Sequence, residues 1–200
     1  MNKHSANLPG RIAAFTLVEM LAVLAIIGVL VAVMLPVIGV AQRAVSRSKT
    51  RAQLLQYMLA YEGFRAEYGY YPTMGESTAK FKLHGHNAVF IETLSGAGLS
   101  GGAMGNDYAL KANPRHARYL TIGESELAPA GAPYAGEIVD ASGNPNLVVI
   151  IDRDRNGLIE ASELADIPAA DRPGPIHASV VMYVENPEGN PDWHWVFSWE

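Results

Sequence analysis

The strongest pattern in the sequence is a long apolar run close to its first residue. Within the 27 residues of 15–41 only Thr16 and Glu19 are polar, and residues 20–41 carry no polar side chain. As a helix, this uncharged stretch extends about 33 Å, slightly more than the roughly 30 Å hydrocarbon core of a bilayer. A secretory signal peptide is the weaker interpretation, because its apolar segment has only about 7–15 residues and ends at a small-residue cleavage site. We therefore expect a membrane-spanning helix.

Apolar positions continue at helical spacing beyond residue 41. They are Val45, Ala52, Leu55, Leu59 and Tyr68. This recurrence predicts an amphipathic helix over 42–68, continuous with the apolar run. Gly69 favours a C-terminal stop, and Pro72 prevents the helix from resuming. The apolar side of this second half needs a sheet to cover it.

The last third of the chain carries the strand patterns. Residues 146–151 are mostly apolar and β-branched, and two further runs, 176–184 and 193–199, are joined by a segment with two prolines and a glycine. The joined pair predicts a C-terminal hairpin over 176–199, and residues 119–122 are a weaker strand candidate. A long helix followed by short strands predicts an α+β fold, with the helix packed on a small antiparallel sheet.

Residues 74–107 show no sustained period. They are rich in Gly, Ser, Thr and Asn, a composition that is typical of loops. We expect a long variable loop here, with one short helix at about 88–94. The globular head as a whole would span 69–200.

Charge is divided unevenly along the chain. The formal net charge is -5, but residues 119–200 contain 14 acidic and three basic side chains. By contrast, Arg43, Arg47, Lys49 and Arg51 follow the apolar run with no acidic residue between them. The sequence contains no cysteine, which excludes disulfides, thiolate nucleophiles and cysteine-ligated zinc within it. The acidic head also argues against nucleic acid as a partner.

The residues at the start of the apolar run resemble a known processing signal. A short leader, basic through Lys3 and Arg11, precedes the segment Ala14-Phe15-Thr16-Leu17-Val18-Glu19. This arrangement resembles the class III signal of type IV pilins and type II secretion pseudopilins. The family usually has Gly directly before the cleavage site, where this chain has Ala14.

The resemblance implies how the N-terminus is processed and used. A prepilin peptidase would cut between Ala14 and Phe15, remove the leader 1–14 and methylate the new N-terminus. The apolar helices 15–41 would then pack into a filament core. There Glu19 would neutralise the N-terminal ammonium of a neighbouring subunit, because a carboxylate out of water needs a matched cation.

The same resemblance implies a pilin-like fold and a structural function. Pro36 falls where many pilins carry a helix-kinking proline, and residues 68–73 resemble the segment after the long helix of major pseudopilins. We expect a subunit of a pilus-like filament, most like a type II secretion pseudopilin that polymerises through its N-terminal helix to drive protein export. Its expected partners are other subunits, in a homopolymer or a mixed pseudopilin filament, the prepilin peptidase and the assembly platform of the inner membrane.

Two rules disagree about orientation in the membrane. The positive-inside rule counts four basic residues at 43–51 against two in the leader, and would place the head inside. Processing by a prepilin peptidase requires the leader to be inside. We therefore expect a single-pass protein of the bacterial inner membrane, with its head on the periplasmic, extracytoplasmic side, that moves into a filament on assembly.

One motif carries metal-binding chemistry. Residues 152–163 match the twelve-residue pattern D-x-D-x-N-G-x-I-x-x-x-E at each specified position. Calcium prefers about six to eight oxygen ligands. The predicted donors are the side chains of Asp152, Asp154, Asn156 and Glu163 and the backbone carbonyl of Leu158. Because a strand precedes the motif, we expect a single strand-loop-helix calcium site and not an EF-hand pair. The alternative is a solvated Asx-rich turn, although major pseudopilins as a family bind calcium.

Two further features favour structural interpretations. His84 and His86 lack a third candidate ligand nearby in sequence, so a flexible loop is favoured over a metal site. Four aromatic residues alternate with other residues near the C-terminus, which places their rings on one face of a strand. They are Trp193, Trp195, Phe197 and Trp199. We expect these rings to pack against the long helix or at a subunit interface, with recognition of a carbohydrate or a protein as the alternative.

We expect no enzyme. The sequence contains Ser, His and Asp but no nucleophile elbow, phosphate loop or HExxH motif. The rival function is a membrane-tethered extracytoplasmic binding module, or a type IV pilin with an adhesive head, in which the aromatic strand and the loop 74–107 recognise a ligand. Glu19 discriminates between a filament subunit and a tethered binder, because a tethered binder has no use for it.

Overall fold

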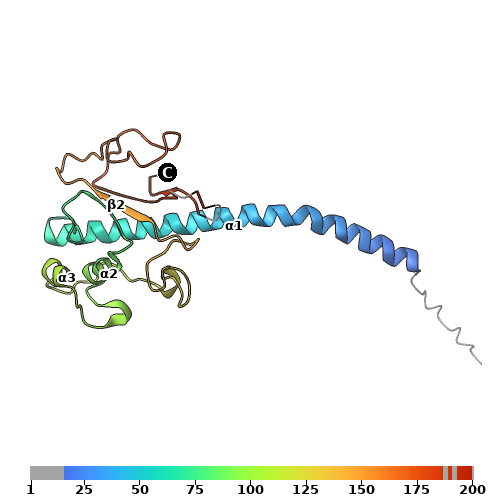
Figure 1. Ribbon diagram of the computed structural model, residues 1–200, viewed down its shortest axis with the longest axis horizontal. Coiled ribbons are helices and arrows are strands. Elements are labelled where there is room, and N and C mark those ends of the chain that lie inside the picture. Colours follow the sequence, from blue (N-terminus) through green and yellow to red (C-terminus); the bar gives the residue numbers. More distant parts are fainter. Residues whose placement is uncertain (1–15, 187–188, 191–192, 200) are drawn as a thin grey trace, which may run out of the picture. The chain divides into compact units, whose positions relative to one another are not determined.

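The computed structural model describes residues 16–186, 189–190 and 193–199, with the backbone alone at 35–37 and 100. Its first element is helix α1, Leu17–Tyr68, which is 52 residues long (Figure 1). The chain divides into two compact units, Met1–Arg43 and Ala44–Glu200, and α1 contributes to both. The predicted leader 1–14 lies outside the described residues. The prediction of one continuous helix that ends near residue 68 is confirmed.

Helix α1 ends at a glycine in the left-handed conformation. Gly69 has a φ of 78°, and its N–H donates to the carbonyl of Arg65 at 2.7 Å. A residue with a Cβ rarely adopts this backbone conformation, so glycine suits the position after a helix. Pro72 has no N–H with which to extend the helix further.

The described residues form one four-stranded antiparallel sheet in the order β1-β2-β3-β4. The strands are β1 Lys80–Lys82, β2 Leu147–Ile151, β3 Val180–Val184 and β4 Val196–Phe197. The longest pairing joins β2 to β3, five residues on each side. Strands β3 and β4 form the expected C-terminal hairpin, although both are shorter than the runs that predicted them. The fold is α+β in a pilin-like arrangement, as the sequence predicts.

Both faces of the sheet are covered. On one face Leu147, Val149 and Ile151 pack with the buried side of α1 and with helix α2, Asn87–Ser95. On the other face Val148 and Ile150 pack with apolar residues of the segment that follows β2. In Figure 1, β2 lies on one side of α1. Helix α2 and the short helix α3, Asp107–Ala112, lie on the other side. A strand buried on both faces needs an apolar side chain at every position, which explains the unbroken apolar run of β2.

The predicted apolar side of α1 is wrong. Val45, Ala52, Leu55 and Leu59 are exposed, and Tyr68 is half-buried. The buried side of the helix consists instead of Leu54, Tyr57, Ala60, Tyr61 and Phe64. Both sets recur at helical spacing, so periodicity alone does not choose between them. Tyr57 and Tyr61 decide which side is buried, because their rings pack on the buried ring of Phe90 in α2. Their centroids lie 5.3 and 6.1 Å from that of Phe90.

Residues 74–107 contain more secondary structure than the expected loop. They include β1, α2 and the short helix η1, Leu99–Gly101. Of these, α2 confirms the short helix expected near 88–94. Strand β1 was not expected, because a three-residue Lys-Phe-Lys segment is too short to show a period and buries only Phe81.

The weak strand prediction at 119–122 is also wrong. These residues pair with no strand among those described. Instead, the N–H groups of Tyr119 and Leu120 both donate to the carbonyl of Leu94, at 2.8 and 3.0 Å. The segment therefore satisfies the C-terminal end of α2, whose last carbonyls have no partner inside the helix. A short helix, η2, Glu124–Glu126, follows it.

A buried carboxylate ties the turn before β2 to α1. Asp140 accepts hydrogen bonds from the N–H groups of Ser142 and Asn144, at 2.7 and 2.9 Å, and from the hydroxyl of Thr50 in α1, at 3.2 Å. Asp140 and Thr50 are both buried. Burial of a carboxylate is tolerable only with such partners, so these bonds fix where β2 starts relative to the helix.

Candidate functional sites

A capping box begins helix α1. The hydroxyl of Thr16 accepts from the N–H of Glu19 at 3.2 Å, and the Glu19 carboxylate accepts from the N–H and the hydroxyl of Thr16, both at 2.8 Å. Reciprocal bonds of this kind satisfy N–H groups that have no partner inside the helix. These bonds hold the Glu19 carboxylate next to the N–H of Thr16. Thr16 directly follows residue 15, which is the predicted new N-terminus. The predicted processing residues Ala14 and Phe15 lie outside the described residues.

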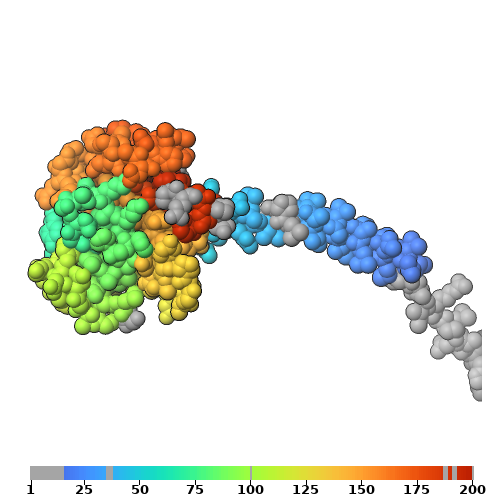
Figure 2. Space-filling view, in the orientation of Figure 1, coloured from blue at the N-terminus to red at the C-terminus, as the bar shows by residue number. Residues whose placement is uncertain are grey.

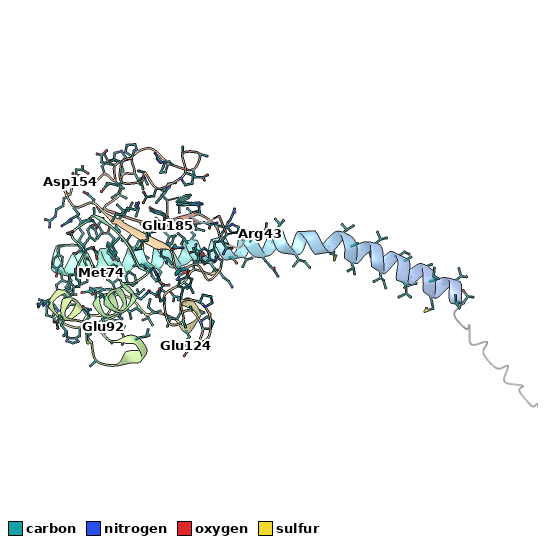
Figure 3. All side chains as sticks on the ribbon, viewed as in Figure 1. Arg43, Met74, Glu92, Glu124, Asp154 and Glu185 are labelled. Atoms are coloured by element: carbon teal, nitrogen blue, oxygen red, sulfur yellow. The ribbon has the colours of Figure 1, made fainter. Side chains whose placement is uncertain are left out.

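The first half of α1 presents an apolar surface. Large apolar side chains across residues 17–40 are exposed in the single chain, Leu17 to 80%, and Figure 3 shows them projecting from the helix. By length and composition, α1 could cross a membrane. Pro36 lies within the helix, and its side chain is outside the described ones. An apolar surface of this extent needs a membrane or other helices to cover it.

The predicted calcium loop 152–163 is curled by hydrogen bonds from its own backbone. Asp152 accepts from the N–H groups of Arg155 and Gly157, at 2.8 and 2.7 Å. Both of those residues have a left-handed backbone, with φ of 61° and 79°. Burial raises the pKa of Asp152, but the hydrogen bonds that it accepts outweigh burial and hold this pKa below its ordinary value. Asp152 is therefore ionised at neutral pH.

Most of the predicted donors line one hollow. Asp152, Asp154, Leu158 and Glu163 border a cavity of about 310 Å³. Asn156 is not among its lining residues. Among the described residues, no three acidic or histidine side chains lie close enough to hold one metal ion. The residue types of the donors and their order along the loop fit calcium. In this structure, however, their side-chain oxygens accept hydrogen bonds from the loop backbone.

Each of these side-chain donors is engaged by a backbone N–H of the loop. Asp154 accepts from the N–H of Asn156 at 3.3 Å, and Asn156 accepts from the N–H of Leu158 at 2.7 Å. Glu163 accepts from the N–H of Glu160 at 2.9 Å. Such Asx-type turns shape a loop of this composition without any ligand.

Turns, and not the expected helix, follow the loop. The N–H of Glu163 donates to the carbonyl of Glu160, and the N–H of Ile167 to that of Leu164, both at 3.0 Å. These three-residue spacings belong to turns. Pro168 disfavours a helical conformation at Ile167, which limits any helix in this short segment.

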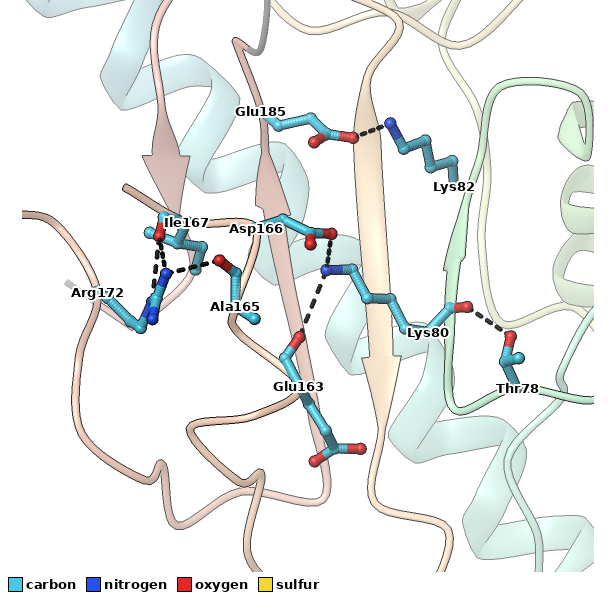
Figure 4. A network of polar contacts seen from close by, with 9 residues as sticks. All are labelled: Thr78, Lys80, Lys82, Glu163, Ala165, Asp166, Ile167, Arg172 and Glu185. Atoms are coloured by element: carbon cyan, nitrogen blue, oxygen red, sulfur yellow. Dashed lines mark hydrogen bonds and ion pairs between the residues drawn. The ribbon is translucent and has the colours of Figure 1, made fainter. Parts of the chain in front are cut away.

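Two basic side chains bind the segment after the loop (Figure 4). Lys80 of β1 forms an ion pair with Asp166 and donates to the carbonyl of Glu163 at 3.4 Å. Arg172 donates to the carbonyl of Ile167 at 2.8 Å. The last predicted donor is thus positioned by an edge strand from far earlier in the sequence. Sequence reasoning missed Lys80, because a strand of three residues leaves no periodic signal.

Three of the four aromatic residues near the C-terminus, Trp195, Phe197 and Trp199, pack with Tyr183 on the sheet face opposite the α1 core. The rings of Phe197 and Trp199 stack with centroids 4.9 Å apart, and those of Trp195 and Tyr183 at 6.2 Å. The prediction that the rings pack in the core against the long helix is therefore wrong, because Val196 and not the rings joins the core of α1. Trp195 and Phe197 only border a hollow beside α1. Their role at a subunit interface stays a prediction.

The two histidines contact different carboxylates. His84 Nδ1 lies 2.5 Å from Glu137 Oε2, and His86 Nε2 lies 2.8 Å from Glu76 Oε1. Each ring is thus held in a separate pair, and the two do not converge on one position.

These features define a protein with an apolar helical anchor, a carboxylate at the start of that helix and an α+β head. Residues 10–35 match the family model of the prokaryotic N-terminal methylation motif. The chain therefore carries the prepilin signal of type IV pilins and pseudopilins. The matched residues include Ala14, Phe15 and Glu19 and end just before Pro36. No curated protein and no solved structure matched the chain.

The prepilin signal gives the function in outline. It implies processing by a prepilin peptidase and pilus-type assembly. It supports a type IV pilin-like filament subunit and, with the apolar helix, fits a membrane-anchored protein. The motif belongs to structural and not catalytic proteins.

Proposed function

We propose that this chain is a pseudopilin of a type II secretion system that polymerises through α1 to drive protein export. The observation that carries the proposal is a prepilin signal at residues 10–35 on a helix with an uncovered apolar surface. The head has its own core and does not need that surface. Assembly with other copies, on the inner-membrane platform and with the head on the periplasmic side, would cover it.

Glu19 supports polymerisation over simple anchoring. An anchor gains nothing from a carboxylate within its apolar run, because charged groups are costly in a bilayer. In a filament the same carboxylate would meet the N-terminal ammonium of the next copy. Of the four aromatic residues that a tethered binding module would use, Phe197 is buried and the three tryptophans are half-buried, so Glu19 and not the aromatic strand favours the filament subunit.

Processing tests this proposal directly. Incubation of the detergent-solubilised full chain with a prepilin peptidase should release residues 1–14 and leave a product that begins at Phe15, measured by intact mass. Ala14→Gly should be cut at least as fast, because it restores the usual small residue, whereas the bulky Ala14→Arg should resist cleavage. A chain that stays intact, or that is cut after Gly10, would contradict the proposal.

We further propose that calcium binds the loop 152–163. Asp152, Asp154, Asn156, the carbonyl of Leu158 and Glu163 would hold it, sharing or exchanging their present hydrogen bonds with backbone N–H groups. The ion would neutralise the clustered carboxylates and cross-link a segment that contains no disulfide.

Calcium should raise the melting temperature of the 44–200 fragment. At about tenfold excess over the dissociation constant, binding adds roughly 1.4 kcal/mol, or about 3–6 °C, relative to chelator. Asp152→Ala should remove this difference, whereas Asp171→Ala, an exposed acid outside the loop, should keep it. Equal melting curves of the unmodified fragment in calcium and in chelator would overturn the metal assignment.

A further inference from the structure

One row of exposed side chains runs along the second half of α1. Arg47, Arg51, Leu55 and Leu59 follow one another at four-residue intervals, which places them on a single ridge of the helix. All four are exposed, Leu59 to 73%. We call these four residues the α1 ridge. The buried side of the helix faces the sheet, so the ridge is a second, uncovered surface.

The two arginines of the ridge are unpaired within the part of the chain that the structure describes. Among the described residues, neither Arg47 nor Arg51 forms a hydrogen bond or an ion pair, whereas Arg65 and Arg115 form both kinds of contact. Like charges four residues apart disfavour a helix. An anionic partner placed beside these two guanidinium groups would relieve this repulsion.

A hollow adjoins the arginine end of the ridge. Arg47, Ser48 and Arg51 form one wall, and Trp195, Val196 and Phe197 form the other, around about 230 Å³. Strand β4 is the edge of the described sheet, and an edge strand leaves backbone groups available for another chain. The hollow therefore combines two guanidinium groups, apolar surface and an open strand edge. It suits a protein segment in which carboxylates alternate with small apolar residues.

The same chain carries a segment of that kind. Residues 160–171 read Glu-Ala-Ser-Glu-Leu-Ala-Asp-Ile-Pro-Ala-Ala-Asp, and we call them the acidic lobe. Glu160 and Asp171 are exposed, and neither side chain has an ion pair within the described part of the chain. Three alanines of the segment, Ala165, Ala169 and Ala170, are exposed. In Figure 2 the orange part of the chain that includes the acidic lobe lies at the outer edge of the head.

We propose that the α1 ridge and its adjoining hollow bind the acidic lobe of a second copy of this chain. The inference rests on the proposed filament function and names the contact between neighbouring heads and helices. Because ridge and lobe are different patches of one chain, each copy can use both at once. A contact of this heterologous type is compatible with an open filament, because it builds a helical array wherever its rotation does not close into a ring.

Cross-linking locates the contact. The chain has no cysteine, so the full-length double variant Ser48→Cys, Ala170→Cys reports on one pair of positions. Filaments of this variant should give a ladder of disulfide-linked multimers on oxidation. The matched control Ser48→Cys, Ala130→Cys, with an exposed alanine outside the acidic lobe, should not give it.

Charge reversal tests the chemistry. Arg47→Glu with Arg51→Glu should lower the yield of filaments at least about tenfold, because carboxylates would then face carboxylates. Glu160→Lys with Asp171→Lys should do the same. The chain with all four changes should recover, since the attraction is restored with inverted sign. Unchanged melting temperatures of the 44–200 fragments in chelator, where the proposed calcium site does not contribute, would show that the head still folds.

The outcomes separate this inference from the proposed function. If the unmodified chain forms no filaments at all, the proposed function fails. If it forms filaments but the double-cysteine variant gives no ladder, or the fourfold variant does not recover, the ridge-to-lobe contact is overturned. If the arginine reversals abolish binding to vesicles of anionic phospholipid and leave filament yield unchanged, the ridge serves the membrane surface and the inference is likewise overturned.

Discussion

Glu19→Val abolishes filament formation and leaves membrane insertion and processing intact: this is the largest effect that we expect of a single change. The carboxylate lies at the first turn of α1, bonded to the N–H of Thr16. After removal of residues 1–14, a free ammonium would stand one residue before that N–H. In an apolar filament core such a charge needs a counter-ion, because an unpaired buried charge is strongly destabilising. Valine makes the helix more apolar, so insertion is not impaired.

The control for this variant separates charge from shape. Glu19→Gln keeps the length of the side chain and part of the capping box but removes the negative charge, so it should also fail to polymerise. Filament yield in the sheared cell fraction and the amount of chain in the membrane fraction give the two readouts. Filaments of Glu19→Val in normal amount would show that α1 assembles without this charge, and would favour a tethered module.

Leu54→Ala should lower the free energy of unfolding of the 44–200 fragment by about 2–5 kcal/mol. Leu54 is fully buried between α1 and the sheet. Its truncation leaves a cavity that the surrounding side chains fill only in part. A loss of this size is a large fraction of the total stability of a domain. Urea unfolding measures it from the shift of the midpoint at constant slope.

The same helix offers a matched control. Leu59→Ala removes the same atoms from a side chain that is 73% exposed, so it should change the free energy of unfolding by no more than about 0.5 kcal/mol. Comparable losses for the two variants would mean that the buried side of α1 is assigned wrongly. For filament yield the order of the two variants should be reversed, with the larger effect for Leu59→Ala, because Leu59 belongs to the α1 ridge.

The elements with long or continuous patterns could be predicted from the sequence. Helix α1, Leu17–Tyr68, ends at the predicted residue because Gly69 and Pro72 give a local stop signal. Strand β2 is predicted by an unbroken apolar run, which is typical of a strand buried on both faces. The prepilin signal is also local, since residues 10–35 carry it without help from the rest of the fold.

The features that depend on packing could not be predicted in this way. The chain has two apolar sides on the second half of α1, and the contact of Tyr57 with Phe90 decides between them. The face of the aromatic strand depends on the register of β4 against β3, which places Phe197 opposite Tyr183. The role of Lys80 depends on an edge strand of three residues.

The loop 152–163 lies between these two cases. Its sequence gives the donors and their order, and the structure places Asp152, Asp154 and Glu163 around one hollow. The same oxygens accept hydrogen bonds from the loop's own N–H groups. The structure thus confirms the strand before the loop and not the helix after it, and the calcium titration decides on the ligand.

The central claim is that this chain is processed at its prepilin signal and polymerises through α1. Mass spectrometry of filaments isolated from the envelope of cells that produce the full chain with its assembly machinery tests both parts at once. We predict filaments built from this chain, with an N-terminal peptide that begins at a methylated Phe15. Filaments that lack the chain, or that contain it with residues 1–14 still attached, would contradict the account.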